Sequence, residues 1–247
     1  MTKDSSNHHH HHRKSRRKRT NDGKADSDLS RSLSWALRHS APSLGLKMSS
    51  DGYVPVRDLL GCNHPRFRNW SESDIRRVVA SNDKQRYSLC ERRYGDFHDT
   101  LDEESSDQPT LCIRANQGHT IRNISTEELL SKIAPERLSE MPIIVHGTYM
   151  KAWEEHIRQE GLSRMRRNHI HFASGLPTSS DVISGMRSNC QVYIFVDGKR
   201  CAEDEIDFFL SDNGVILSPG TEDGNLPTKY FSHVLNAKDN DILWDNR

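Results

Sequence analysis

Apolar residues follow a helical spacing from Leu29 onward, recurring at positions 29, 33, 36 and 37. This i, i+4, i+7, i+8 pattern predicts one face of an amphipathic helix. The helix should end near His39, because Pro42 disfavours helical backbone at Ala41. The patterned part of the chain therefore begins close to residue 29.

Two further helices and two strands are predicted in the same half. Residues 58–60 start a short helix after the apolar stretch 53–56, and Ser71 and Asp74 have the spacing of a capping box. Three short helices followed by a β-hairpin are the order of a winged-helix module, although a fold does not fix a function. The strands are expected at 87–91 and 111–114, and the segment 95–110 between them is rich in Asp, Glu and Ser and reads as an exposed acidic insertion.

The second half mixes strands and helices. Ser125 and Glu128 are spaced to cap a helix, and Asp212-Asn213-Gly214 predicts the turn of a hairpin. We therefore expect an α+β protein with a strand-rich second half. Its expected strands are 142–146, 169–173, 192–197, 208–210 and 215–217, and its expected helices are 149–159 and the segment around Ser184.

Composition narrows the class of protein. The longest apolar runs, such as 192–196, have about five residues, whereas a membrane helix needs about 18 or more. The N-terminus is basic but has no apolar region behind it, so it is not a secretory signal peptide. Five cysteines without a CxxC pair fit neither a disulfide framework nor a zinc site. We expect an intracellular protein of the cytoplasm, the nucleus or both.

The net charge of zero hides an asymmetry. Residues 1–24 carry a net charge of +6, including six basic residues within 13–19, and the remainder carries −6. This arm is either a solvated tail, a nuclear address or a tether for nucleic acid. The run 8–12 is five histidines, native or tag-derived, and no metal site is assigned to it. The expected units are a disordered basic tail (1–28), a first lobe (29–124), a second lobe (125–237) and a C-terminal tail (238–247).

The residues that can do chemistry lie at the ends of predicted elements. The chain has neither GxxxxGK[ST] nor GxGxxG, so P-loop phosphoryl transfer and Rossmann hydride transfer are not expected. His146-Gly147-Thr148 follows a strand, and His169 and His171 share one face of another. Arg38-His39 either caps the first helix or binds an anion through its guanidinium group. Together these groups describe a pocket for a sugar-phosphate ligand.

Five motifs match a known family in order. They are LSWALRH (33–39), IRANQGH (113–119), VHGT (145–148), GLSRMRRNHIHFA (161–173) and ISGMRS (183–188), and NGVILSPG (213–220) extends the match. With these motifs the chain resembles the NAD-dependent RNA 2′-phosphotransferases over about residues 29–235. The basic tail and the acidic insertion lie outside the resemblance.

The resemblance implies an N-terminal winged-helix lobe that binds RNA and a C-terminal ADP-ribosyltransferase-like lobe that binds NAD⁺. It implies that NAD⁺ is consumed, without a metal, to remove the 2′-phosphate from spliced tRNA in the last step of tRNA splicing. The products are 2′-OH RNA, ADP-ribose 1″,2″-cyclic phosphate and nicotinamide. We expect a monomer that binds RNA and no membrane.

The resemblance also assigns residues. The catalytic positions fall on Arg38, His39, Arg114 and Arg167, with Arg166 as an adjacent rival for the last. The NAD⁺-contacting positions fall on His146, Gly147, Thr148, His171, Ser184, Gly185 and Arg187.

Two other functions stay open at this point. An enzyme could keep the NAD⁺ chemistry but stop after its first step, leaving ADP-ribose on a terminal phosphate of RNA or DNA. A non-catalytic binder could hold nucleic acid in one lobe and sense a nucleotide in the other. Arginines in both halves argue against the binder, since binding alone gives no reason to place them around NAD⁺.

Overall fold

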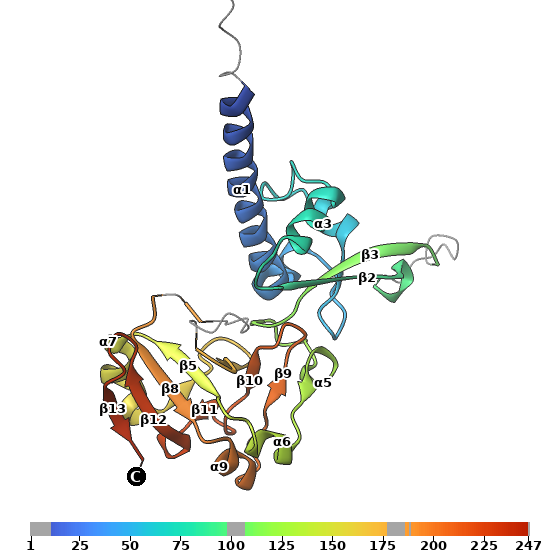
Figure 1. Cartoon of the computed structure of the whole chain (residues 1–247). Coiled ribbons are helices and arrows are strands. Elements are labelled where there is room, and N and C mark those ends of the chain that lie inside the picture. The colour runs from blue at the N-terminus through green and yellow to red at the C-terminus, as the bar shows by residue number, and fades with distance from the viewer. Residues whose placement is uncertain (1–10, 98–106, 177–185, 188, 247) are drawn as a thin grey trace, which may run out of the picture.

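The computed structural model describes residues 11–97, 107–176, 186–187 and 189–246, which form two halves (Figure 1). The N-terminal half combines helices with an antiparallel sheet in the order β1-β3-β2. Its elements are α1 (His11–Trp35), η1 (Ala36–Ser40), η2 (Pro42–Leu44), β1 (Val54–Pro55), α2 (Val56–Gly61), α3 (Glu72–Ala80), β2 (Tyr87–Arg93), η3 (Tyr94–Asp96) and β3 (Pro109–Ala115).

The C-terminal half is built on two four-stranded sheets, in the orders β4-β9-β10-β7 and β13-β12-β8-β5, and a small β11-β6 pair. A bridge between Val145 and Ala173 joins the two larger sheets. The helices are α5 (Thr126–Leu129), α6 (Pro135–Ser139), α7 (Met150–Ala152), η4 (Trp153–Ile157), α8 (Arg158–Glu160), α9 (Gly198–Glu203) and η5 (Thr228–Tyr230). The strands are β4 (Ser131–Lys132), β5 (Val145–Thr148), β6 (Leu162–Ser163), β7 (Ile170–Phe172), β8 (Val192–Val196), β9 (Phe209–Leu210), β10 (Ile216–Ser218), β11 (Asn225–Leu226), β12 (Phe231–Asn236) and β13 (Ile242–Asp245).

The predicted α+β class is confirmed, and so are several local elements. Ser71 and Asp74 form the capping box at the start of α3, each side chain bonding the other's backbone. The helical segment that begins with α1 ends at Ser40, close to the predicted end at His39. The hairpin of β9 and β10 turns at residues 212–214, and Gly214 supplies the positive φ of 75°.

The first helix begins earlier than predicted. It starts at His11, which differs from the expected disordered tail over residues 1–28. No proline interrupts the chain before Pro42, so the helix extends backward from its packed end. In addition, Asp26 binds Arg77 of α3, with 2.9 Å between Oδ1 and Nη2, which holds this part of the helix against the N-terminal half.

The C-terminal end also differs from the prediction. Residues 242–245, expected to lie in a tail, form β13 and pair with β12. Trp244 packs edge-on against Phe231 at 6.0 Å between ring centroids, so this strand adds to the apolar core. Asn240, with φ 63°, makes the turn that precedes it. Most of the acidic insertion (98–106) and the predicted helix around Ser184 lie outside the described residues.

The two halves share packing and hydrogen bonds. The core of the N-terminal half continues into the C-terminal half through residues such as Leu129, Phe209 and Leu217. Backbone links also cross, since the Asn168 N–H donates to the carbonyl of His119 at 3.0 Å. The groups at this boundary are therefore held in a defined arrangement.

Candidate active site

Arg38 lies at the boundary between the halves, in the π-helical turn η1 that continues α1. Its side chain packs against Gly118, because a Cβ built on that glycine would lie 3.4 Å from Nε and Cζ of Arg38. Gly118 also has φ 90°, which side-chain-bearing residues rarely adopt. The absence of a side chain at residue 118 therefore leaves room for the Arg38 guanidinium.

The Arg38 guanidinium is buried without an acidic partner. Its Nε and Nη2 atoms are shielded from solvent and have no hydrogen-bond partner among the described residues. Burial lowers the pKa of Arg38 to about 10; Tyr87 opposes this effect, and the charges of Arg86 and Arg167 add to it. The group stays charged at neutral pH. Each unsatisfied buried donor costs about 1–3 kcal/mol, which an anion would recover.

His39 is the exposed neighbour of Arg38. Its Nδ1 lies 3.0 Å from the Thr120 hydroxyl, and the Thr120 N–H donates to the Arg38 carbonyl at 2.9 Å. Partial burial, followed by the charges of Arg38, Arg167 and Arg166, lowers the pKa of His39. The ring is therefore predominantly neutral at pH 7 and can donate or accept one hydrogen.

Arg167 lies in the loop between β6 and β7 and forms a positive cluster with Arg38 and Arg187. Burial and the charge of Arg187 lower the pKa of Arg167. No described carboxylate forms an ion pair with its side chain. Because charge effects fall off with distance, Arg167 lies near the four groups whose pKa values its charge lowers: Arg38, His39, His146 and His171.

His146 in β5 and His171 in β7 lie near Arg167 on the side of the C-terminal half. The His171 Nδ1 lies 3.0 Å from the carbonyl oxygen of His169, and its Nε2 lies 2.8 Å from the side-chain oxygen of Gln117. The His146 Nδ1 donates to the carbonyl of His171 at 2.8 Å. Burial lowers the pKa of both rings, so two neutral imidazoles stand beside charged Arg167.

Gly147 in β5 has no side chain, so the segment that contains Met186 and Cys190 packs closely against this strand. A Cβ there would lie 2.6 Å from the Met186 sulfur and 3.1 Å from the Cys190 sulfur. Arg187 donates from Nη1 to the Tyr149 hydroxyl at 3.1 Å, and Thr148 accepts the Gln191 N–H through its carbonyl. Two other predicted NAD⁺-contacting residues, Ser184 and Gly185, lie outside the described residues.

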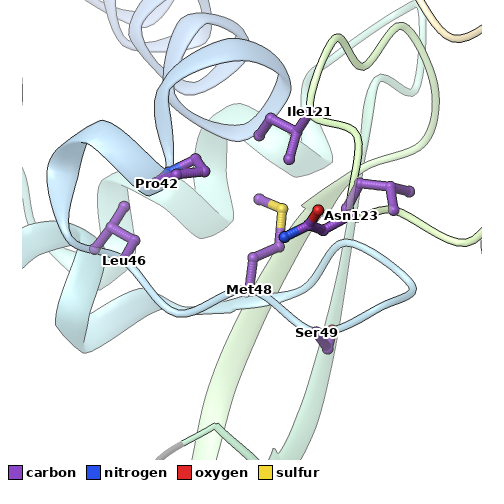
Figure 2. A pocket seen from close by; sticks show the side chains of 7 residues that line it. Pro42, Leu46, Met48, Ser49, Ile121 and Asn123 are labelled. Atoms are coloured by element: carbon purple, nitrogen blue, oxygen red, sulfur yellow. The ribbon is translucent and has the colours of Figure 1, made fainter.

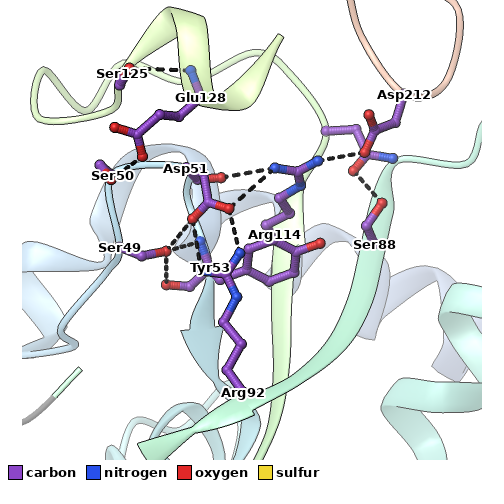
Figure 3. A network of polar contacts seen from close by, with 11 residues as sticks. Ser49, Ser50, Asp51, Tyr53, Ser88, Arg92, Arg114, Ser125, Glu128 and Asp212 are labelled. Carbon is purple, nitrogen blue, oxygen red and sulfur yellow. Dashed lines mark hydrogen bonds and ion pairs between the residues drawn. The ribbon is translucent and has the colours of Figure 1, made fainter. Parts of the chain in front are cut away.

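Arg114 occupies a different environment (Figure 3). Its Nη2 donates to the Asp212 carboxylate at 2.5 Å, and its Nη1 donates to the Asp51 carbonyl at 3.2 Å. The Asp51 carboxylate lies 3.7 Å away, and the guanidinium stacks on Tyr53 at 4.8 Å. Both Nη atoms of Arg114 are thus engaged, and only its buried Nε has no hydrogen-bond partner among the described residues.

The carboxylates around Arg114 belong to a larger network. Asp51 also binds Arg92 and accepts a hydrogen bond from the Ser49 hydroxyl at 2.6 Å. Burial alone raises the pKa of Asp51, but the bonds from Arg92 and Ser49 and the charge of Arg114 outweigh it and lower the pKa. Asp51 is therefore a charged partner that holds Arg114 in place.

Sequence reasoning missed several groups near the cluster. His119 is 3% exposed, and neither ring nitrogen has a hydrogen-bond partner among the described residues. Burial, reinforced by Arg38, His39 and other charges, lowers its pKa to about 3. His119 and Gln117 lie inside the motif 113–119, so the motif was their signal. Arg86 lies outside every quoted motif, and only the fold brings it close to Arg38.

The described residues form neither a metal site nor a membrane-spanning helix. Within the described ranges, no group of three or more His, Cys, Asp or Glu side chains is arranged to hold a metal ion. No helix in the described part of the chain is long and apolar enough to cross a membrane.

Comparison with known proteins decides the family. The family model "RNA 2′-phosphotransferase, Tpt1 / KptA family" matches residues 24–220. The chain belongs to this family. It is 44% identical over 218 residues to tRNA 2′-phosphotransferase 1 of Danio rerio, covering 88% of this chain and 89% of that protein. The human protein of that name is 44% identical over 214 residues, covering 86% and 77%. The tRNA 2′-phosphotransferase of Saccharomyces cerevisiae is 34% identical over 226 residues, covering 89% of each.

Family membership confirms the function predicted from the motifs: an RNA 2′-phosphotransferase, a transferase whose family performs the last step of tRNA splicing. The matched region contains the whole positive cluster, from Arg38 to Arg187. It ends at residue 220, so β12 and β13 lie beyond it. RNA is accordingly the substrate that the cluster has to accommodate.

Proposed function

We propose that this enzyme transfers the 2′-phosphate of spliced tRNA to NAD⁺. A phosphate oxygen of the RNA displaces nicotinamide from C1″ of the ribose. The ribose 2″-hydroxyl then attacks phosphorus, and the RNA 2′-oxygen leaves with a proton. The products are 2′-OH RNA, ADP-ribose 1″,2″-cyclic phosphate and nicotinamide.

The observation that carries the proposal is the unpaired, buried guanidinium of Arg38 next to Arg167. A phosphate anion is already a nucleophile, so the first step requires positioning and charge compensation more than a strong base. Arginine presents a rigid fork of donors that fits phosphate oxygens. We assign the phosphate contacts to Arg38 and Arg167. Arg114, whose two Nη groups bind Asp51 and Asp212, connects the two halves.

The histidines fit a positively charged dinucleotide. The rings of His146 and His171 are neutral at pH 7, because burial lowers the pKa of both. Neutral imidazoles do not repel the nicotinamide cation, whereas Arg187 can attract the pyrophosphate. His39, exposed at the same boundary, is the group placed to take the proton of the attacking 2″-hydroxyl and pass it to the departing RNA oxygen.

The architecture supports a division of labour. Helices α1, α2 and α3 followed by the β2–β3 hairpin have the order of a winged-helix lobe, which we assign to RNA. The strand-rich half that carries His146 and His171 we assign to an ADP-ribosyltransferase-like lobe. We further propose a monomer that acts in the cytoplasm, the nucleus or both.

The test is incubation of the full chain with NAD⁺ and a short RNA bearing one internal 2′-phosphate, with the products resolved by mass. The proposal predicts 2′-OH RNA and ADP-ribose cyclic phosphate, in the presence of EDTA and only with NAD⁺. RNA that retains ADP-ribose as the final product would instead identify an ADP-ribosyltransferase. Phosphate release without NAD⁺ would contradict the proposal.

A further inference from the structure

A cavity lies in the N-terminal half beside the proposed active site (Figure 2). Its volume is about 180 Å³, below the roughly 300–1,000 Å³ of pockets for drug-sized ligands, so it suits a single ring system. Figure 2 shows the Met48 thioether and the Asn123 amide directed into the space between Pro42 and Ile121. Leu46 and Ser49 also line the cavity.

The walls of this cavity are bonded to the residues that flank the positive cluster. Ile121 follows Thr120, whose hydroxyl lies 3.0 Å from the His39 Nδ1. The carbonyl of Ile121 accepts a hydrogen bond at 3.0 Å from the side chain of Asn168, the neighbour of Arg167. A ligand held at the cluster therefore has the cavity within reach of its adjoining parts.

The surroundings of the cavity favour a polyanion. Lys47 and Arg122 are exposed and lie in the two chain segments that line it. Neither forms an ion pair with a described carboxylate. Exposed cations in these two segments attract the phosphodiester backbone, and such attraction supplies much of the affinity of nucleic-acid complexes. This charge distinguishes the cavity from a pocket for an apolar peptide side chain.

We propose that this cavity binds the base of a nucleotide adjacent to the one that carries the 2′-phosphate. Pro42, Met48 and Ile121 contact the faces of the unstacked base, and the Asn123 amide bonds its edge, as amides do in base recognition. The inference rests on the proposed function, because it places the phosphate at Arg38. It adds a site that recognises the RNA chain rather than the phosphate alone.

The experiment compares three RNA hexamers with one internal 2′-phosphate: the intact RNA, one lacking the base on the 5′ side of the phosphorylated nucleotide, and one lacking it on the 3′ side. Binding to the full chain is measured by fluorescence anisotropy, and 2′-phosphate removal is measured with NAD⁺. We expect one abasic RNA to show Kd and KM raised about tenfold, with kcat unchanged. Equal affinities for all three RNAs would overturn the proposal.

Two variants test whether the loss of RNA affinity comes from the cavity. Asn123→Leu should raise Kd for the intact RNA about tenfold and have no further effect on the sensitive abasic RNA, because base and amide act through one contact. Asn69→Leu is the matched control, an exposed asparagine of the same half outside the cavity, and should change neither value. Equal loss for intact and abasic RNA with Asn123→Leu would refute the assignment.

The two proposals fail differently. If NAD⁺-dependent phosphate removal fails with every RNA, the proposed function is wrong, and the anisotropy measurement still decides the cavity. If removal proceeds equally with all three RNAs and binding does not discriminate between them, the function stands and the base site is wrong.

Discussion

Arg38 and Arg114 are both buried arginines from matched motifs, yet their surroundings are opposite. Arg114 binds Asp212 and the backbone of Asp51 through its two Nη groups and stacks on Tyr53, so only its Nε has no partner among the described residues. Arg38 packs on Gly118 with two donors that no described group accepts. Arg114 is thus a paired cation whose charge is used within the fold. Arg38 keeps its binding capacity for an external anion.

The difference shows what a buried charge contributes. A paired buried cation is costly to remove because its partners lose their bonds, whereas an unpaired one is already unfavourable in the free protein. That unfavourable energy becomes binding energy when a phosphate arrives. Stability and activity should therefore respond in opposite ways to truncation of the two side chains.

The largest effect is expected for Arg38→Ala on turnover. Losing two charge-assisted bonds of about 1.5–3 kcal/mol each lowers kcat/KM for 2′-phosphate removal at least about 100-fold. The free energy of unfolding should stay the same or rise, because an unsatisfied buried cation is gone. Kinetics with a 2′-phosphorylated RNA and urea unfolding measure the two quantities. Arg38→Lys keeps the charge without the fork and should restore activity only in part.

Arg114→Ala should show its main effect on stability. Removing it leaves Asp212 and the Asp51 backbone without their donors, which costs about 2–3 kcal/mol of unfolding free energy. Urea unfolding of Arg114→Ala, Asp212→Ala and the double variant measures their coupling. Strictly additive losses would show that the contact contributes nothing.

Acid should destabilise the fold through the buried histidines. Burial lowers the pKa of His119 to about 3 and that of His169 to about 4, below the ordinary value of 6.5. Between those values the unfolded chain binds more protons, so stability is complete above about pH 6.5 and falls as the pH drops. At pH 5 each of these two rings lowers the free energy of unfolding by about 2 kcal/mol. His169→Asn should lose less stability than the natural chain between pH 7.5 and pH 5, as urea unfolding would show.

The smallest expected effect is the difference in kcat/KM between Arg167→Ala and Arg166→Ala. Arg167→Ala removes one charge near Arg38 and should lower kcat/KM about tenfold. Arg166→Ala should stay within about twofold, since among the groups described above only His39 senses the charge of Arg166, whereas Arg38, His39, His146 and His171 all sense that of Arg167. The reverse ranking in steady-state kinetics would move the phosphate contact to Arg166.

Much of the fold follows from local patterns, but the charge partners do not. The capping box at Ser71 and the turn at Gly214 depend on residues a few positions apart, so they were predictable. The pairing of β13 with β12 depends on the packing of Trp244 on Phe231, which no local pattern in residues 238–247 indicates.

Long-range folding also explains why the motifs did not distinguish the arginines of the site. Motifs named Arg38, Arg114 and Arg167 as equivalent candidates, because a motif records residue type and spacing. Asp212, which distinguishes Arg114 from the others, lies 98 residues away in sequence. Arg86 and the cavity at Asn123 depend likewise on long-range folding. Only the three-dimensional arrangement shows which arginine has acidic partners within the fold.

The most direct test is the preference of the protein for 2′-phosphorylated over 2′-OH RNA, measured as a ratio of dissociation constants without NAD⁺. The natural chain and the control Arg166→Ala should prefer the phosphorylated RNA at least about tenfold. Arg38→Ala, with its fold intact, should lose most of this preference, because only the Arg167 contact to the phosphate is left. If Arg38→Ala keeps the full preference, the phosphate is held elsewhere, and the central claim is contradicted.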